Sequence, residues 1–498
     1  MSVKIQAEPS CPEKMQTFDF LDELPATEKM QDSPLEILDA EEKTDWKLIS
    51  VAGVVAFLTV IENTVVGMSE WPYMKQIDKE ATAQFFGAAT SASKAGHAIF
   101  TLVFAAWSFH YKTVKAPLIA GRVVATIACI LYLGVEILPS GHRYLMMFCY
   151  ILFGIASSAS TILRAYVVAI SSSKDRPRAF TCISAATIFS IIIGPLVQLA
   201  FTRIPYPGYT LLPRVHLHVY SAPIWIASLT NFVAIAVILC YIRDARKRKP
   251  AAERKKINLE TLKLKFRKLR KSNINWKLVI LCWTMKTATT FSHLTFATIL
   301  SIFLMAAYGW TGAFTVRIIS MLMGGVGLMS ITVLFSYMVC RMGEIIQQRF
   351  AFFAAMAMSA LLYVITYPYP FTSNSIAKYD NVTDTGCDPS RYTWCETSSA
   401  VNPILLLASL VVVKGIAIPT SHVSLDTIYS RILGGIDQSV MQGTILVVED
   451  IVAVMTPIYA SSVFAHFGIE SLWITNGVLF CLATFLWACF LGELRPFH

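Results

Sequence analysis

Long apolar runs, separated by short polar stretches, recur along almost the whole chain of 498 residues. A run of about 20 apolar residues has the length that an α-helix needs to cross the hydrocarbon core of a membrane. Twelve such runs can be placed, and we expect a spanning helix in each: 48–71, 83–107, 117–138, 144–172, 179–203, 219–242, 276–307, 314–340, 344–368, 402–430, 439–467 and 469–493. The pattern predicts an all-α polytopic membrane protein with 12 transmembrane helices in two six-helix halves.

Two polar connections are longer than the others and divide the chain. Residues 243–275 separate the sixth and seventh runs, and residues 369–401 separate the ninth and tenth. We therefore expect an N-terminal six-helix bundle over 47–242, a linker, and a C-terminal six-helix bundle over 276–498 that carries a large loop. Residues 1–46 hold 12 acidic residues against 4 lysines, which predicts a disordered acidic tail without a cleavable signal peptide.

A helix–loop–helix pattern occurs twice in corresponding places. Within the stretch Gly154–Gln198, a charged residue, Arg164, is followed 31 positions later by Pro195, where we expect the second helix to be interrupted. Late in the chain, Asp426 is followed 31 positions later by Pro457. A repeated charge and proline at the same spacing favours two equivalent halves, as in secondary transporters.

Composition agrees with a membrane protein, because 55% of the residues are hydrophobic and only 15% are charged, against about 25% in soluble domains. The net charge of +10 is uneven, since residues 243–271 hold 14 Lys and Arg against 3 acids. Four apolar residues recur there at helical spacing: Leu259, Leu262, Phe266 and Leu269. We expect a basic amphipathic helix over 257–271 on the anionic lipid of the cytosolic leaflet. A charge block that only sets topology is the alternative, and the pattern does not favour nucleic-acid binding.

Basic residues gather in alternate loops, which the positive-inside bias places in the cytosol together with both termini. These residues are Lys112, Lys115, Lys174, Arg176, Arg178, Arg341, Arg349 and Arg431. The loop 369–401 falls on the opposite side and contains the triplet Asn381-Val-Thr383, so we expect glycosylation at Asn381. Cys387 and Cys395 share this loop, where an oxidising compartment favours a disulfide between them.

Ionisable residues inside the apolar runs cost about 2.5–3.5 kcal/mol each on insertion scales, so each requires an explanation. Arg122, Glu136 and Arg317 lie near the ends of their runs, where side chains can reach the interface, and we expect structural roles for them. Counting along each run at about 1.5 Å per residue places a second set near the midplane. This set comprises Glu62, Lys94, His97, Lys286, His293, Lys414, Glu449 and Asp450.

We expect the midplane set to line a polar cavity between the halves. Lys94 and His97 are three positions apart and share one helix face. The lysines are suited to attract an anion, whereas the carboxylates and histidines are suited to exchange protons. Structural ion pairs that fix the register of the helices are the alternative explanation for the same residues.

Arg164 and Asp426 lie closer to the cytosolic ends of their runs, so we expect them to act as gating residues together with Pro195 and Pro457. His422 and Asp426 share a helix face, but two potential ligands without a third do not predict a metal site. No motif in the chain indicates a cofactor.

Several motifs resemble the major facilitator superfamily. Gly194-Pro195 and the turn Arg341-x-Gly343 resemble the superfamily in general, and three further motifs resemble a lysosomal branch of it: Trp71-Pro72-Tyr73, Trp394-Cys395 and Tyr429-Ser-x-Ile-Leu-Gly434. Two positions depart from the pattern. The sequence Trp107–Lys112 stands in place of Gly-x-x-x-Asp-Arg-x-Gly, and Tyr150 stands where an arginine usually precedes the glycine of the fourth span. The proton-coupling role of that arginine is therefore not carried over.

The resemblance implies a monomeric, multi-pass endolysosomal membrane protein that moves a small solute, with chloride-like anion conductance attributed to the family. We therefore predict a transporter and not an enzyme, which passes a small anion by alternating access or channel-like conduction. The alternatives are proton-coupled transport of an organic metabolite, an intramembrane enzyme built on His422 and Asp426, and a receptor or scaffold that transports nothing. The plasma membrane is the alternative location, because the tail shows no clear acidic dileucine sorting signal.

Overall fold

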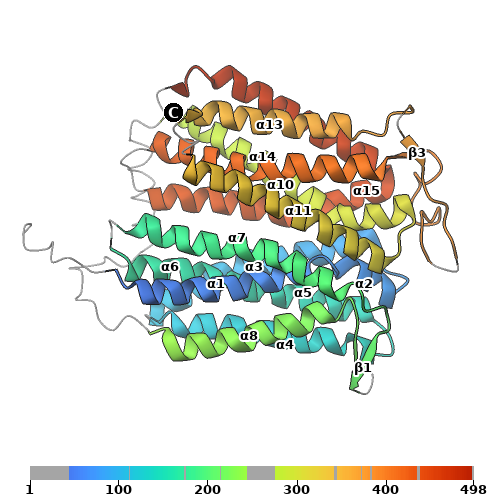
Figure 1. The fold of residues 1–498 in the computed structure, drawn as a ribbon, viewed down its shortest axis with the longest axis horizontal. Helices are drawn as coiled ribbons and strands as arrows, with labels where there is room; N and C mark the ends of the chain where they lie inside the picture. Colours follow the sequence, from blue (N-terminus) through green and yellow to red (C-terminus); the bar gives the residue numbers. More distant parts are fainter. Residues whose placement is uncertain are drawn as a thin grey trace, which may run out of the picture. The chain divides into compact units, whose positions relative to one another are not determined.

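The computed structural model describes residues 44–498, with gaps at 112, 173–174, 213–214, 244–274, 341–344, 372, 382–383, 434–437 and 496–498. Within this part, long helices run side by side, and two short antiparallel β-pairs lie at one end of the bundle (Figure 1). The predicted amphipathic helix at 257–271 and almost all of the predicted tail fall outside the described residues.

The N-terminal half consists of helices and one β-hairpin. In chain order they are α1 (Trp46–Val66), α2 (Glu70–Ile77), α3 (Ala83–Tyr111), α4 (Lys115–Leu133), the 3₁₀ helix η1 (Gly134–Ile137), α5 (His142–Ser158), α6 (Ser160–Ile170), α7 (Arg176–Phe201), β1 (Tyr209–Leu212), β2 (Val215–Leu217) and α8 (Ala222–Tyr241). The first helix starts where Asp45 caps it, because Asp45 Oδ1 accepts a hydrogen bond from Leu48 N at 3.2 Å.

The C-terminal half follows the same plan. Its elements are α10 (Trp276–Tyr308), α11 (Gly312–Val339), α13 (Gln348–Ile365), β3 (Ser373–Ser375), β4 (Ser399–Val401), α14 (Pro403–Leu433) and α15 (Gln438–Phe490). The last of these is two helices that meet at Gly468, whose φ of 76° lies in the left-handed region. A Cβ at this position would also lie 2.9 Å from the Trp394 ring, so the bend requires glycine.

The predicted fold class is confirmed. Ten helices of the described chain are long and apolar enough to cross a membrane. The polar helix α3 is not one of them, although it is as long as its neighbours and packs along α5 and α15. Counting α3, and dividing α15 at Gly468, gives the twelve expected spans.

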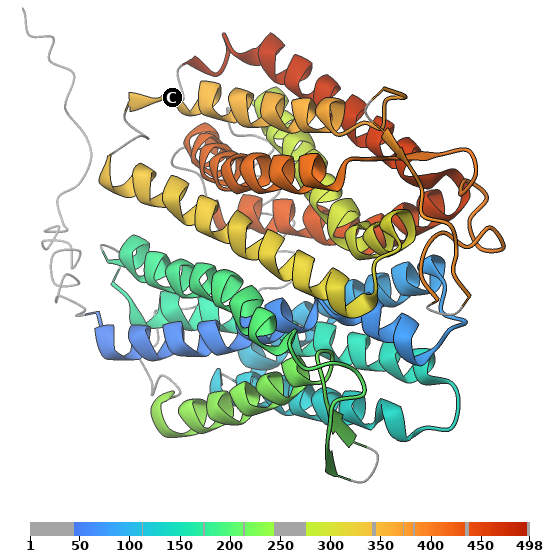
Figure 2. The ribbon, with the colours of Figure 1, turned by 45° about the vertical axis from the view of Figure 1, so that its right-hand side comes forward.

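The helices form two groups that meet mainly along two pairs of helices, with smaller contacts of α2 and α3 on α10 and of α2 on α11. In the N-terminal group α1 packs on α7 and α8, and α4 packs on α5 and α8, whereas in the C-terminal group α13 packs on α14 and α15. The groups touch where α3 meets α15 and where α7 meets α11. Figure 2 shows the blue-to-green helices of the first group on one side and the yellow-to-red helices of the second on the other. A cavity between the groups is therefore bounded by helices from both halves.

The expectation that Pro195 interrupts its helix is wrong, since α7 continues from Arg176 to Phe201 with Pro195 inside it. Membrane helices tolerate an internal proline, although it removes one hydrogen bond to the carbonyl four residues earlier. Here α1 packs closely against α7: a Cβ added to Gly194 would lie only 2.3 Å from Thr64 Oγ1. Thr64 Oγ1 also donates a hydrogen bond to Ser190 O at 3.2 Å. The Gly194-Pro195 pair thus permits close packing and does not break the helix.

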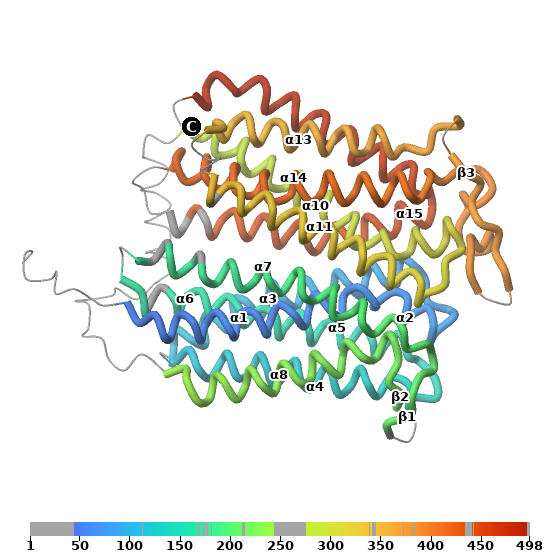
Figure 3. Tube along the Cα trace, viewed as in Figure 1, coloured from blue at the N-terminus to red at the C-terminus, as the bar shows by residue number. Residues whose placement is uncertain are grey.

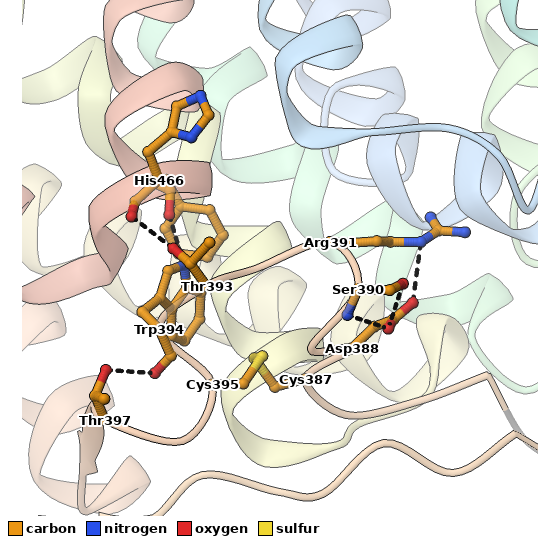
Figure 4. Close-up of a disulfide and its surroundings, with 10 residues drawn as sticks. Cys387, Asp388, Ser390, Arg391, Thr393, Trp394, Cys395, Thr397 and His466 are labelled. Atoms are coloured by element: carbon orange, nitrogen blue, oxygen red, sulfur yellow. Dashed lines mark hydrogen bonds and ion pairs between the residues drawn. A yellow bond between two sulfur atoms is a disulfide. The ribbon is translucent and has the colours of Figure 1, made fainter.

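The β-pairs and the loop 369–401 lie at the end of the bundle that the sequence assigns to the lumen (Figure 3). Cys387 and Cys395 form a disulfide in this loop, beside an Asp388–Arg391 ion pair of 3.2 Å (Figure 4). The loop is held on the C-terminal half, because Trp394 Nε1 donates to Phe464 O at 2.7 Å. Asn381 is exposed in the same loop, and the next two residues of its triplet fall outside the described residues.

The same loop also contacts the N-terminal half. Arg391 donates hydrogen bonds to Ala81 O, at 3.0 Å, and to Lys79 O. Lys75 forms an ion pair with Asp384 at 3.3 Å. We call this set of contacts the lumenal latch: Lys75, Lys79 and Ala81 on one side, and Asp384, Asp388 and Arg391 on the other. It joins the two halves at the predicted lumenal end.

Candidate functional site

A cavity of about 660 Å³ lies between the halves, close to the middle of the bundle. Helices α1, α3 and α5 contribute one wall, and α10, α14 and α15 contribute the other. Its ionisable lining residues are Glu62, Glu70, Lys94, His97, His293, His422, Glu449 and Asp450. The volume falls within the roughly 300–1,000 Å³ of small-molecule binding sites.

Lys94 and His97 face the cavity from α3. The position of this helix is fixed by close backbone packing on α5, because a Cβ on Gly154 would lie 2.0 Å from Ser93 O. His97 Nδ1 lies 2.9 Å from Ser157 Oγ, which orients the imidazole. Among the described residues, no carboxylate lies within ion-pair distance of Lys94 Nζ. Glu70 and Asp450 are within electrostatic range of it, so its charge is only partly balanced.

The expectation that Arg122 reaches the membrane interface is wrong. Its side chain is 2% exposed and points into the bundle. Nη1 donates to Glu62 Oε2 and to Asn231 Oδ1, both at 2.9 Å, and Nη2 donates to Ala156 O at 3.1 Å. Inside the bundle the guanidinium has three acceptors, from α1, α8 and α5. These fixed hydrogen bonds stabilise it there, and the side chain does not turn toward the end of α4. Glu62 therefore lines the cavity and also forms an ion pair with a buried arginine.

Glu136 has structural partners, as its position near the end of a span suggested. Its two carboxylate oxygens lie 3.0 Å from His216 Nδ1 and 2.8 Å from His218 Nε2. These contacts attach the β1–β2 hairpin to η1. They lie outside the lining of the central cavity.

On the C-terminal wall, Lys286 is the centre of a charged network that joins three helices. Its Nζ lies 3.2 Å from His422 Nδ1, 3.4 Å from Glu449 Oε1 and 3.9 Å from Asp426 Oδ1. Thr290 Oγ1 adds a hydrogen bond to Glu449 Oε1 at 3.1 Å. The network brings the predicted gating residue Asp426 next to the predicted site residues. In the described part of the chain, no three metal-ligating side chains come together.

Lys414 lies apart from the central cavity, in a side pocket of about 70 Å³. The pocket shares Thr289, His293 and His422 with the central cavity, so the two are adjacent. Lys414 Nζ lies 5.7 Å from the centre of the Phe296 ring and 5.8 Å from that of Tyr363.

The other predicted gating residues do not line either cavity. Arg164 is exposed on α6, and Pro195 lies inside α7. Pro457 lies in α15 at a close contact between the two halves, since a Cβ on Gly87 of α3 would lie 2.6 Å from Pro457 O. The structure thus gathers six of the eight midplane residues in one cavity, places Lys286 behind its wall, and separates Lys414.

One acidic lining residue was missed by the sequence interpretation. Glu70 lies in the short helix α2, which follows α1 after a turn, whereas the first apolar run was extended to residue 71. A signal for a new helix start was present, because Ser69 precedes an acid in the first turn and Pro72 follows closely. Recognition of that start would have placed Glu70 at the beginning of a new short helix and not inside a span.

Comparisons with known proteins agree on the architecture. The family model described as Major Facilitator Superfamily matches residues 52–377. Major facilitator superfamily domain-containing protein 8 from Xenopus laevis is 24% identical over 470 residues, which cover 89% of this chain and 91% of that protein.

Solved structures share the fold at low sequence identity. A D-xylose-proton symporter superposes with a TM-score of 0.63 at 11% identity, over 89% of this chain and 97% of the symporter. The nucleoside transporter NupG gives a TM-score of 0.57 at 12% identity, over 89% and 98% of the two chains. A bacterial homologue of the human lysosomal transporter Spinster, inward-facing and unoccupied, gives 0.56 at 12% identity, over 91% and 97%.

Proposed function

Because the chain belongs to the major facilitator superfamily and is a multi-pass membrane transporter, we propose that it carries a small anionic solute. In this proposal the central cavity is exposed alternately to the two sides of the membrane as the halves move against each other. The observation that carries the proposal is Lys94, a cavity-facing cation without a carboxylate at ion-pair distance among the described residues.

The cations near the cavity differ in how far they are neutralised. Arg122 has Glu62, and Lys286 has Glu449 and Asp426. Lys94 has only the more distant charges of Glu70 and Asp450, together with its neighbour His97. An anion beside Lys94 would form a charge-assisted hydrogen bond in a site partly shielded from water, where such bonds are strong.

The size of the cavity favours an organic anion over a bare halide. A site of about 660 Å³ is far larger than a single monatomic ion occupies, and it matches the usual range for small-molecule ligands. The alternative form of the proposal is that the same cavity conducts a small inorganic anion such as chloride. The flux experiment below distinguishes the two.

Asp450 favours proton coupling as a second feature of the cycle. It reaches the cavity from α15, opposite Lys94 and His97 on α3. A bound anion and an ionised Asp450 would compete for Lys94 and His97, and protonation of Asp450 removes that competition. Anion uptake that consumes a proton is therefore the expected form of coupling.

We place the transporter in the endolysosomal membrane as part of the proposal, with the loop 369–401 in the lumen. The disulfide Cys387–Cys395 suits an oxidising compartment. The latch is also suited to acid. Burial raises the pKa of Asp388, but hydrogen bonds from Ser390 and the charge of Arg391 outweigh it and hold that pKa below its usual range. The alternative location, the plasma membrane, would be revealed by the distribution of the tagged full chain.

The test is flux through the purified full chain in proteoliposomes, with chloride and a panel of organic carboxylates, with and without a pH gradient. Lys94→Gln should lower anion flux roughly tenfold or more, because a hydrogen bond to a charged group contributes about 1.5–3 kcal/mol. The matched control is Lys277→Gln, an exposed lysine at the start of α10. Full flux in Lys94→Gln would refute the proposed site.

The same preparation separates the two forms of the proposal. Saturable uptake of an organic anion driven by a pH gradient, and lost in Asp450→Asn, supports the proton-coupled carrier. Chloride current that needs no pH gradient and is unchanged in Asp450→Asn supports the conductive form. Absence of any anion flux would leave the non-transporting alternatives and overturn the proposal.

A further inference from the structure

Lys414 is a buried cation whose charge is not balanced by an acid. It lies in the middle of α14 and is 7% exposed. No described carboxylate lies within ion-pair distance of its ammonium group, and none lines its pocket. An ammonium group removed from water without a partner costs several kcal/mol, so an unbalanced lysine at this depth requires a compensating group.

The aromatic rings of Phe296 and Tyr363 compensate only in part. Each lies just under 6 Å from Lys414 Nζ, at the limit of a cation–π contact. Such contacts are weak beside a full ion pair, and a ring carries no net charge. A charged Lys414 therefore has no counter-charge among the residues that line its pocket.

The other lining groups suit an anion. Besides Lys414, the polar residues of the pocket are Thr289, His293, Ser359, Ser421 and His422. Lys286 Nζ, which can only donate, lies 3.2 Å from His422 Nδ1 and therefore holds this nitrogen as the acceptor. The neutral His422 ring then carries its proton on Nε2, which is left as a donor. The hydroxyl of Ser421 donates to Ile418 O at 2.9 Å and can rotate toward a ligand at the cost of that one hydrogen bond.

From this arrangement we propose that the pocket around Lys414 is a second anion site, which binds one small monovalent anion of halide size. Its volume of about 70 Å³ exceeds the roughly 10–15 Å³ that one water molecule requires and is far below the roughly 300–1,000 Å³ of small-molecule sites. The central cavity, by contrast, is about 660 Å³ and carries four acids. The two sites therefore differ in the size of the anion that each can hold.

The second site lies wholly within the C-terminal half, since α10, α13, α14 and α15 supply its lining. Through Thr289, His293 and His422 it borders the central cavity. A bound anion there would help to set the charge of the wall that the transported solute meets. This inference concerns binding and does not depend on which solute the protein carries.

The test measures the thermal unfolding of the purified full chain in sodium chloride, sodium bromide and sodium gluconate at equal ionic strength. A ligand that binds only the folded state stabilises it in proportion to ln(1 + [L]/Kd). We expect Tm to rise by about 1–3 °C in chloride or bromide relative to gluconate. The rise should be absent in Lys414→Met, which nearly keeps the volume of the side chain and removes the charge.

Two controls locate the ion. Lys277→Met changes an exposed lysine and should keep the halide-dependent rise in Tm, and so should Lys94→Met if the halide sits in the side pocket. A rise that Lys94→Met abolishes and Lys414→Met keeps would assign the halide to the central cavity and overturn the second site. No rise in the unaltered chain would overturn it as well, because it would mean that Lys414 is neutral or balanced by other groups.

A direct measurement covers the case in which Lys414→Met does not fold. Crystals of the unaltered chain grown in bromide should show an anomalous peak beside Lys414 Nζ, and the peak should disappear on exchange into gluconate. Loss of flux in Lys94→Gln with this peak intact would separate the two sites. A peak only in the central cavity, or none at all, would contradict the proposal.

Discussion

Two buried cations, one in each half, differ in whether hydrogen-bond acceptors surround their charged groups. Arg122 of α4 has a carboxylate, an amide oxygen and a backbone carbonyl within 3.1 Å. Lys414 of α14 has two aromatic rings and a small pocket. The hydrogen bonds of Arg122 thus join α1, α4, α5 and α8, whereas the charge of Lys414 remains available to a ligand.

The difference extends to the walls of the central cavity. The N-terminal wall is fixed by saturated contacts, including the Arg122–Glu62 pair and the packing of Gly154 on Ser93. The C-terminal wall carries the Lys286 network, in which one ammonium serves three acceptors at 3.2–3.9 Å and can exchange among them. We infer that the N-terminal half presents Lys94 from a rigid frame and that the C-terminal half adjusts its charges as ligands and protons bind.

The largest effect is expected when the saturated cation is removed. Arg122→Met leaves the buried carboxylate of Glu62 without its partner, which should lower the free energy of unfolding by about 3–5 kcal/mol. Thermal unfolding of the purified chain measures this. The double variant Glu62→Gln with Arg122→Met should recover most of the loss, because no unpaired charge remains. Equal losses in the single and double variants would show that the charge pair is not the cause.

The rigid frame of the N-terminal half gives a second prediction. Gly154→Ala places a Cβ where Ser93 O now lies 2.0 Å away, so α3 and α5 must separate. We expect a loss of about 1–3 kcal/mol in stability and a fall in anion flux, because Lys94 moves with α3. Gly443→Ala in α15 is the control, since nothing lies within 4 Å of its Cβ position and alanine favours a helix. A stable Gly154→Ala variant with full flux would contradict the rigid-frame model.

Position along a span groups several of the charged residues, but it misplaces Arg122 and does not predict which residues are partners. Depth follows from counting residues along a span, because a helix rises by a constant amount per residue. Glu62, Lys94 and His97 are therefore found at the same cavity. Partners depend on how each helix is rotated against its neighbours, which no local pattern records. Arg122 is the clearest case, because its acceptors come from three helices far apart in the sequence.

The same reason explains why Lys414 could not be distinguished from Lys94 in the sequence. Both are single lysines in apolar runs at similar depth. Only the tertiary structure shows that Lys414 faces a side pocket of its own half, and that Lys94 faces the other half. Glu70 was missed for a different reason, since the short helix α2 begins directly after the first apolar run.

The lumenal latch tests whether the two halves separate at that end during transport. Arg391→Ala removes two hydrogen bonds to the N-terminal half, which should shift the balance toward the lumen-open state by about 1–2 kcal/mol, or roughly tenfold. Labelling of Thr90→Cys by an impermeant maleimide from the lumenal side should rise accordingly. Arg143→Ala is the control, because Arg143 pairs with Asp78 and Glu80 inside the N-terminal half. Unchanged labelling would exclude the latch as a gate.

The pH dependence of this effect has a definite sign. A carboxyl group whose folded pKa is depressed contributes stability above its unfolded pKa and loses it only as the pH falls through the lower folded value. Asp388 is such a group, because Ser390 and Arg391 outweigh its burial. Its support of Arg391 should therefore be complete at both neutral pH and about pH 5. A rise in the labelling of Thr90→Cys with Arg391 intact, as the pH falls from neutral to about 5, would contradict this part of the latch.

The smallest effect, and the one of opposite sign to Arg122→Met, is expected at Lys414. In halide-free buffer Lys414→Met removes an unbalanced charge while it keeps the volume of the side chain, so stability should stay equal or rise by about 1 kcal/mol. Lys414→Ala is the comparison, because it removes the same charge but enlarges the pocket and should lower stability. Calorimetry of the three chains in gluconate measures both differences. If Lys414→Met lost as much stability as Arg122→Met, the lysine would have to be paired, and the contrast between the two halves would fail.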